Sequence, residues 1–226
     1  MLYIILIILL FALFFLPQWW VKHTMQRYNK TIDALPGTGG ELAQHLITQY
    51  QLPVTLEVTD QGDHYDPSTK TVRLSEQYLN GKSLTAIAIA AHEVGHAIQD
   101  HKKDKLLILR GKMVVASQGM QKMGAAIMFV APLMTLFSRS PLVGLIIALI
   151  GLLSMASSVV VQMISLPVEF DASFNKALPL LKKGHYVPKQ DLIAVHQVLL
   201  AAALTYVAAA LASLLNVWRW LALLKR

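Results

Sequence analysis

The chain has 226 residues, of which 55% are hydrophobic and 15% are charged, and its formal net charge at pH 7 is +7. Soluble domains carry about 25% charged residues, so this composition favours a membrane protein, and the scarcity of charge excludes a disordered chain. The chain contains no cysteine. This absence excludes a disulfide scaffold, a cysteine-ligated zinc site, an iron–sulfur cluster and a thiol nucleophile, and it leaves His, Asp and Glu as the metal ligands.

Long stretches without charged side chains predict four membrane-spanning helices, each near the length of roughly 20 residues that a bilayer requires. The first, residues 1–21, ends in two tryptophans, which collect at membrane interfaces. Because it lacks a basic n-region and a small-residue cleavage site, we expect a retained anchor rather than a signal peptide. Residues 113–166 are predicted to form a hairpin of two spans. The first is long enough to cross a bilayer if the Lys122 side chain extends along the helix and carries its charge to the membrane surface. The last span is expected at 192–218.

Charged residues gather in two blocks between the spans, 22–112 and 167–191, and in a basic tail at 219–226. Lys and Arg lie at both ends of the first block and recur in the second, so the positive-inside rule predicts that both blocks are cytoplasmic. The other basic residues lie beside the spans and form no stripe with interleaved aromatic residues, which argues against a nucleic-acid partner. The lipid bilayer is the expected surrounding of the spans.

The first block is predicted to be a small α+β domain. We expect a short helix at 39–50, strands at 54–59 and 70–74, and a helix at 84–101 that Ser83 caps. Turn-forming residues lie between the two strands, which predicts loops there.

One motif in the last of these helices carries chemistry: His92 and His96 lie one helical turn apart, with Glu93 beside the first. Residues four apart share a helical face, so the two imidazoles can bind one Zn²⁺. Glu93 points to the side of this pair and can face a water on the metal, as the general base of the HExxH metalloproteases does. The surrounding helix is apolar, so burial without a partner would be costly, which favours a metal site over a core cluster.

A catalytic zinc needs a third protein ligand. His101 lies on the wrong face of the helix, and the H-x-x-G-x-x-H extension of the metzincins is absent. The acids after residue 112 are Glu169, Asp171 and Asp191. Two predicted spans separate His96 from Glu169, and an even number of crossings returns Glu169 to the side of the histidines. Pro167 is predicted to end the third span and to start a new helix, with Glu169 near its N-terminal end.

Several segments carry a family resemblance: the N-terminal anchor, His64-Tyr65-Asp66-Pro67, Val72-Arg73-Leu74-Ser75, the stretch 90–99 around the HExxH motif, and the stretch 166–172 around Glu169. On these residues the chain resembles the YugP-type neutral zinc metallopeptidases of bacterial membranes and, more distantly, the HtpX and Ste24 membrane proteases. The resemblance implies a bacterial inner-membrane location. It also implies a gluzincin-like site for one Zn²⁺, with His92, His96 and Glu169 as ligands and Glu93 as the catalytic residue.

The resemblance implies further roles. In the HtpX-type pattern an Asp follows the ligand Glu about one helical turn later, and here Asp171 follows by two residues; it would accept a hydrogen bond from a ligand imidazole. An edge strand before the metal helix often aligns substrate by β-addition. The candidate is the predicted strand with Thr71, Val72, Arg73 and Leu74, and a plain structural strand is the alternative. The candidates for an oxyanion stabiliser are His185 and Tyr186, for which a loop position in water is the alternative.

Together these features predict a mainly α-helical integral membrane protein with about four transmembrane helices and a small α+β gluzincin-like metallopeptidase core. We expect a zinc metalloendopeptidase that hydrolyses peptide bonds of membrane or misfolded proteins. Glu93 would take the proton of a zinc-activated water and pass it to the leaving amine. Two alternatives stay open: a zinc-dependent hydrolase of a non-protein amide, and a non-catalytic scaffold with a structural zinc, which would not need Glu93. A transporter is disfavoured because the spans show no repeated halves.

Overall fold

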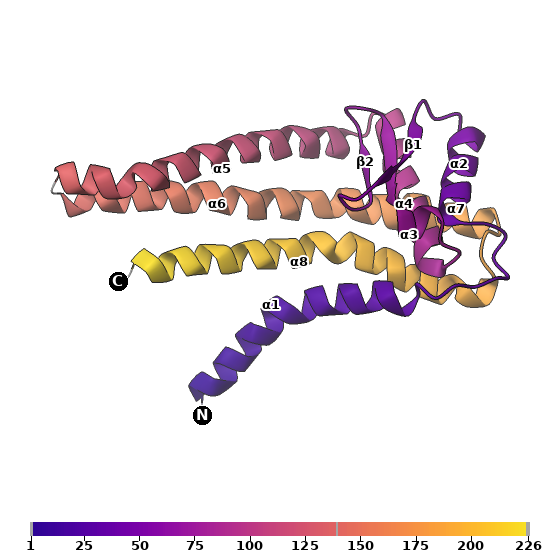
Figure 1. Ribbon diagram of the computed structural model, residues 1–226, viewed down its shortest axis with the longest axis horizontal. Helices are drawn as coiled ribbons and strands as arrows, with labels where there is room; N and C mark the ends of the chain where they lie inside the picture. The colour runs from indigo at the N-terminus through magenta and orange to yellow at the C-terminus, as the bar shows by residue number, and fades with distance from the viewer. Residues whose placement is uncertain (1, 139, 225–226) are drawn as a thin grey trace. The chain divides into compact units, whose positions relative to one another are not determined.

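The computed structural model describes the backbone of residues 2–138 and 140–224 (Figure 1). Side chains are described in these ranges except at positions 2–4, 6–10, 128, 131–132, 135–136, 138, 141, 148, 152, 155–156 and 212–224. The start of the predicted anchor and the end of the predicted basic tail, residues 1 and 225–226, lie outside the described residues. The chain forms two compact units, which we call the mixed unit (Pro17–Ile108 and Leu166–Thr205) and the helical unit (Met1–Leu16, Leu109–Ser165 and Tyr206–Arg226).

The chain is mainly helical, with one small sheet, as the sequence predicts. In chain order the elements are α1 (Leu2–Arg27), α2 (Gly39–Gln49), β1 (Thr55–Thr59), β2 (His64–Asp66), β3 (Thr71–Ser75), α3 (Glu76–Leu79), α4 (Leu84–His101), α5 (Lys105–Ser138), α6 (Pro141–Phe170), the π-helix η1 (Asp171–Ala177), α7 (Leu178–Lys183), the 3₁₀-helix η2 (Lys189–Asp191) and α8 (Leu192–Leu224). The two helices and two strands predicted within 22–112 are confirmed as α2, α4, β1 and β3.

The sheet of the mixed unit has three strands in the order β1-β3-β2. β3 pairs in parallel with β1 and antiparallel with β2, so it lies at the centre of the sheet with a strand on each side. A central strand has no free edge for an added strand. The prediction that substrate adds to β3 is therefore wrong for Thr71, Val72, Arg73 and Leu74. The sequence does not reveal β2, because three residues between turns are too few to show an alternating pattern.

Helix α4 carries the HExxH motif through the core of the mixed unit. Ser83 caps it, since the Ser83 side-chain oxygen accepts a hydrogen bond of 3.0 Å from the backbone N–H of Ala86. Every residue from Leu84 to Gln99 is buried, and α4 contacts α2, η1, β2 and β3. Each large apolar side chain buried around it contributes roughly 1.5–3 kcal/mol, which holds α4 in place. These side chains include Leu42, Leu46, Val72, Leu74, Ile87, Val94, Leu181, Val195 and Leu199.

Helix α6 continues through Pro167 and ends at Phe170, where the π-helix η1 follows directly. The prediction that Pro167 starts a new helix is therefore wrong, and Glu169 lies at the C-terminal end of α6 instead. Proline has no N–H, so α6 loses one backbone hydrogen bond at this position, a loss that helices in apolar surroundings tolerate. In η1 the hydrogen bonds run from i to i+5, which changes the directions of the side chains that follow Glu169.

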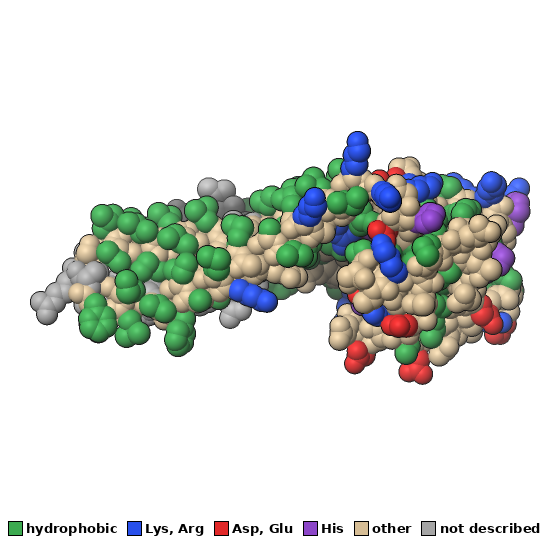
Figure 2. All heavy atoms as spheres, turned by 90° about the horizontal axis from the view of Figure 1, so that it is seen from above, with side chains coloured by type: hydrophobic (Ala, Val, Ile, Leu, Met, Phe, Trp, Pro, Cys, Tyr) green, Lys and Arg blue, Asp and Glu red, His purple; other side chains and the backbone are tan. Residues whose placement is uncertain are grey.

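In the helical unit, α5 and α6 run antiparallel and side by side (Figure 1). The hydroxyls of Ser117 on α5 and Ser157 on α6 lie 2.9 Å apart. Many large hydrophobic side chains of these helices are exposed, and Figure 2 shows apolar side chains gathered over them. Examples are Val115, Met123, Phe129, Phe137 and Leu153. An apolar surface of this extent is typical of a membrane or interaction surface rather than of one that faces water.

Among the described residues, one helical stretch, Lys189–Leu211, is long and apolar enough to cross a membrane, with a mean hydropathy of 1.9. It overlaps the span predicted at 192–218. The other predicted spans, at 1–21 and within 113–166, contain side chains that the structure does not describe. The number of four spans is therefore not confirmed and stays a prediction.

Candidate metal centre

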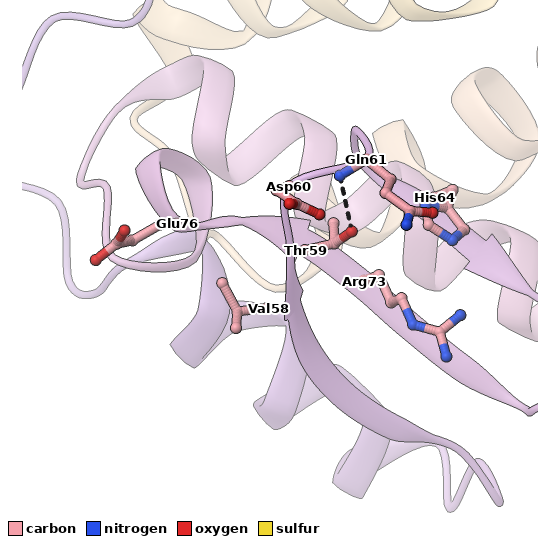
Figure 3. A pocket seen from close by; sticks show the side chains of 7 residues that line it. All are labelled: Val58, Thr59, Asp60, Gln61, His64, Arg73 and Glu76. Atoms are coloured by element: carbon pink, nitrogen blue, oxygen red, sulfur yellow. Dashed lines mark hydrogen bonds between the residues drawn. The ribbon is translucent and has the colours of Figure 1, made fainter.

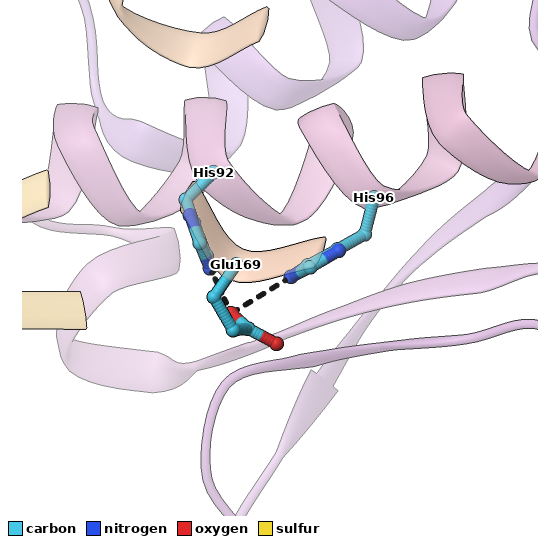
Figure 4. A group of neighbouring side chains, drawn as sticks. All are labelled: His92, His96 and Glu169. Atoms are coloured by element: carbon cyan, nitrogen blue, oxygen red, sulfur yellow. Dashed lines mark hydrogen bonds and ion pairs between the residues drawn. The ribbon is translucent and has the colours of Figure 1, made fainter. Parts of the chain in front are cut away.

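Three buried side chains converge in the mixed unit (Figure 4). His92 and His96 project from one face of α4, and Glu169 reaches them from the end of α6. Glu169 Oε2 lies 3.1 Å from Nε2 of His92 and 3.2 Å from Nε2 of His96. One ligand atom from each residue lies within 4.8 Å of the other two. The structure thus brings together the three predicted ligands, which lie as far as 77 positions apart in the sequence.

Gln99 determines which ring nitrogen of His96 faces Glu169. Its Oε1 lies 2.8 Å from His96 Nδ1, while its Nε2 donates to the backbone oxygen of Val168 at 2.9 Å and to Asp171 Oδ2 at 2.8 Å. Because the amide nitrogen is engaged by two acceptors, the amide oxygen faces His96 and accepts the Nδ1–H. The Nε2 lone pair of a neutral His96 is then directed at the cluster.

Ser173 performs the same task for His92. The Ser173 hydroxyl donates to the backbone oxygen of Leu199 at 3.1 Å and lies 3.0 Å from His92 Nδ1. Because the Ser173 hydroxyl donates its proton to Leu199, its oxygen acts as the acceptor for the Nδ1–H of His92. Ser173 follows Glu169 by four residues, so it stands about one helical turn after the ligand Glu, where the HtpX-type pattern has an Asp.

The convergent atoms fit a zinc ion. Tetrahedral zinc ligands at about 2.0–2.1 Å from the metal lie roughly 3.3 Å from one another. The two separations that involve Glu169 Oε2, 3.1 and 3.2 Å, are close to this value, and the ligand atoms of the two histidines lie within 4.8 Å of each other. Two imidazole nitrogens and a carboxylate oxygen are all acceptors once both Nδ1 atoms carry their protons. Three acceptors directed at one point require a cation between them, and this donor set suits zinc.

The carboxyl group of Glu169 is held ionised at this point. Burial raises the pKa of Glu169, but His96 and His92, where they carry an Nε2 proton and donate it to Oε2, lower the pKa more, so it lies below its ordinary value. A metal ion bound at this point would take the place of those Nε2 protons. Glu169 is only 1% exposed, which keeps bulk water from competing for its oxygens. A carboxylate that is already deprotonated can ligate a metal without first losing a proton.

Asp171 lies one hydrogen bond further from the cluster than predicted. Its carboxylate accepts hydrogen bonds from Gln99, Asn175 and Lys176. Burial raises its pKa, but these three partners lower the pKa below the ordinary value. The prediction that Asp171 accepts a hydrogen bond directly from a ligand imidazole is corrected: it holds Gln99, and Gln99 holds His96. The reason is the two-residue spacing from Glu169, which in η1 directs Asp171 toward the end of α4.

Gly95 brings the two ligand-bearing segments together. A Cβ atom at this position would lie 2.9 Å from the backbone oxygen of Ala172 in η1, closer than real Cβ atoms approach a backbone atom. The motif glycine therefore lets α4 contact the segment after Glu169 at backbone distance. Glu93, next to His92 on α4, is also buried, at 7% exposed.

The predicted oxyanion candidates lie on the loop that follows α7. The Tyr186 hydroxyl lies 2.9 Å from His45 Nε2 and donates to Gln49 of α2 at 3.1 Å, and burial raises the pKa of Tyr186. His185 is exposed and has a positive φ of 54°. No hydrogen bond among the described residues links either side chain to the ligand cluster, and their proposed role stays a prediction.

A separate hollow of about 870 Å³ lies over the sheet (Figure 3). Its lining comes from the turn between β1 and β2 and from neighbouring positions: Val58, Thr59, Asp60, Gln61, His64, Arg73 and Glu76. Arg73 is held there by ion pairs of 2.9 Å to Asp66 and 3.1 Å to Glu57. None of the three cluster residues lines this hollow, so we assign the chemistry to the buried cluster.

Comparison with known proteins agrees with this geometry. The chain matches, over residues 3–225, the family described as "Putative neutral zinc metallopeptidase". It is 36% identical over 226 residues to the "Putative membrane protease YugP" of Bacillus subtilis (strain 168), covering 97% of this chain and 95% of that protein. No solved structure matches the chain. With a cluster that can hold one metal ion and a family match along nearly its whole length, the chain belongs to this family of neutral zinc metallopeptidases.

Proposed function

We propose that the protein is a zinc-dependent metalloendopeptidase of the bacterial inner membrane that hydrolyses membrane or misfolded proteins. The observation that carries the proposal is the arrangement of His92, His96 and Glu169. Both imidazoles have their Nδ1–H groups engaged by Gln99 and Ser173, so that their remaining nitrogens and Glu169 Oε2 are directed at one point. The family match and the name of the Bacillus relative support a protease.

Glu93 is the proposed proton carrier. Zinc held by the three ligands would lower the pKa of a bound water toward about 7 and polarise the scissile carbonyl. Glu93 lies next to His92 on α4 and is buried, where a carboxylate can take a proton from water and give it to the leaving amine. A purely structural zinc site has no use for such a group, which favours catalysis over the scaffold alternative.

We propose that the substrate backbone aligns on β2 rather than on the central strand β3. β2 is an outer strand of the sheet, and α4 contacts it. The Tyr65 hydroxyl of β2 donates to Asp100 of α4 at 2.5 Å, which fixes this edge relative to the ligand helix. Burial and the carboxylate of Asp100 raise the pKa of Tyr65, so its hydroxyl keeps the proton that it donates to Asp100.

The decisive experiment compares Glu93→Gln with Glu76→Gln, a matched change on α3 away from the cluster. Both variants and the wild type are purified in detergent, and zinc content and cleavage of an unfolded protein are measured. We expect all three to bind one zinc per chain, Glu76→Gln to cleave like the wild type, and Glu93→Gln to lose at least about 10³-fold in kcat. Cleavage by Glu93→Gln at the wild-type rate would contradict the proposed mechanism.

The proposed topology has the cluster in the cytoplasm and the turn between α5 and α6 outside. Because the chain lacks cysteine, single cysteines can be labelled cleanly. We expect Ser140→Cys to react with a membrane-impermeant maleimide in cells with a permeable outer layer, and Ser68→Cys to react only after the inner membrane is opened. Labelling of both positions from the same side would contradict the multi-pass arrangement.

A further inference from the structure

Helices α5 and α6 of the helical unit, with Tyr206 of α8, line a groove of about 550 Å³. The polar side chains in its lining include Arg110, Ser117, Gln121, Ser158 and Gln162. The helices around the groove otherwise expose apolar side chains, such as Met163 beside Gln162. Amides and hydroxyls gathered in apolar surroundings are costly unless polar partners satisfy them, so they indicate a function.

Some of the polar side chains that line the groove form hydrogen bonds with one another. Gln121 Nε2 donates to Ser117 Oγ at 3.0 Å. The guanidinium of Arg110 donates to the Tyr206 hydroxyl and lies 4.8 Å from the centre of its ring. Gln162 Oε1 differs: it is buried and accepts no hydrogen bond from any described residue. Because this oxygen is buried, a ligand reaches it only where the Gln162 side chain turns into the groove that it lines, and that ligand must bring a hydrogen-bond donor.

We propose that the groove binds the backbone of a substrate polypeptide where its helix has unwound. A peptide group brings an N–H donor for Gln162 and a carbonyl acceptor for the other amides and hydroxyls of the lining. A lipid phosphate would suit Arg110 but would bring no donor to Gln162. The inference rests on the proposed protease function and names its substrate class: membrane-embedded segments that unwind locally.

The groove residues of α6 occupy one face of that helix. Ser158, Gln162 and Ser165 follow one another at intervals of four and three residues, and Glu169 follows four residues later in α6. Residues at these intervals lie on the same helical face. The groove residues of α6 thus belong to the same helix as Glu169, the third proposed metal ligand.

Single-cysteine photo-cross-linking tests the proposal without any need for turnover. Gln162→Cys and, as the matched control, Met163→Cys are each made in the Glu93→Gln chain and labelled with a benzophenone maleimide. Each is mixed in lipid vesicles with a single-span protein whose membrane segment contains glycine and proline. We expect the probe at 162 to cross-link to that segment with at least about fivefold higher yield than the probe at 163. Equal yields, or cross-links mainly to phospholipid, would overturn the proposal.

Kinetics provide the second test. In the double variant Gln121→Leu/Gln162→Leu, we expect KM for the single-span substrate to rise roughly tenfold, as the loss of one or two hydrogen bonds predicts. Hydrolysis of a short soluble peptide should stay within about twofold of the wild type, and Met163→Leu should change neither. An equal loss on both substrates would overturn the proposal. If the wild type hydrolyses neither substrate, the protease function itself fails, while the cross-linking still decides whether the groove binds polypeptide.

Discussion

Replacing Ser173 with alanine tests how the cluster holds its ion. The change removes the oxygen that lies 3.0 Å from His92 Nδ1, in a site where His92 is only 4% exposed. A buried N–H left without an acceptor costs about 1–3 kcal/mol. Removing such a partner of a ligand imidazole typically weakens metal binding by about 10- to 100-fold, which corresponds to about 1.4–2.7 kcal/mol. The two estimates agree, so we expect Ser173→Ala to bind zinc about 10- to 100-fold more weakly than the wild type.

The assay is competition for zinc against a chelator of known affinity, with the protein in detergent at neutral pH. Ser154→Ala is the matched control, because it removes a buried hydroxyl of α6, which donates to the backbone oxygen of Gly151 at 2.7 Å. We expect Ser154→Ala to bind zinc like the wild type. Thermal unfolding of the metal-free proteins separates an effect on the ligands from a general loss of stability. Wild-type zinc affinity in Ser173→Ala would refute the role assigned to this hydroxyl.

Two further predictions concern the framework of the site. In Gly95→Ala the new methyl group would meet the backbone oxygen of Ala172 at 2.9 Å, so we expect zinc affinity to fall by at least about tenfold and the melting temperature to drop. In Asp66→Asn we expect a loss of about 1 kcal/mol in unfolding free energy. The pKa of Asp66 is held below its ordinary value of 3.8, first by the Ser68 hydrogen bond and then, against some burial, by Arg73. The stabilisation is therefore complete above pH 3.8 and is lost as the pH falls further.

Each of these variants has its own check. A Gly111→Ala chain, in which a new Cβ meets no atom within 4 Å, should bind zinc and melt like the wild type, in contrast to Gly95→Ala. Equal zinc affinities for Gly95→Ala and the wild type would contradict the prediction, since they would show that α4 and η1 can move apart without displacing the metal ligands. For Asp66→Asn, denaturant unfolding is measured from pH 7 to pH 3. A difference from the wild type that is unchanged at pH 3 would mean that the ionised carboxylate is not its source.

The ligand set could be predicted from the sequence because its residue types are scarce. Charged and imidazole groups on an apolar helix stand out at His92 and His96, and after residue 112 the chain has one glutamate. The N-terminal cap of α4 could also be predicted, since the Ser83 hydroxyl accepts a hydrogen bond from a residue only three positions away. Such local signals do not depend on how the rest of the chain folds.

The partners of the ligands could not be predicted in the same way. Gln99 and Ser173 are uncharged residues of common types, and their roles depend on the direction that η1 gives to each side chain. The central position of β3 depends on β2, a strand of three residues that pairs with β3 across a short loop but is too short to show an alternating pattern. Pro167 indicated a helix end, but α6 continues through it with one backbone hydrogen bond fewer.

Both ligand imidazoles rest on uncharged groups, the amide oxygen of Gln99 and the hydroxyl of Ser173. A carboxylate in either place would make the imidazole a more basic and more tightly binding ligand. Asp171, the carboxylate that accepts from Gln99, is itself paired with Lys176 at 2.8 Å. A divalent ion would thus meet the buried carboxylate of Glu169 and two imidazoles that no carboxylate makes more basic, so it is held less tightly than it would be with carboxylate partners. We expect rapid exchange of zinc, so that the metal supply of the cell sets how much of this protein is active.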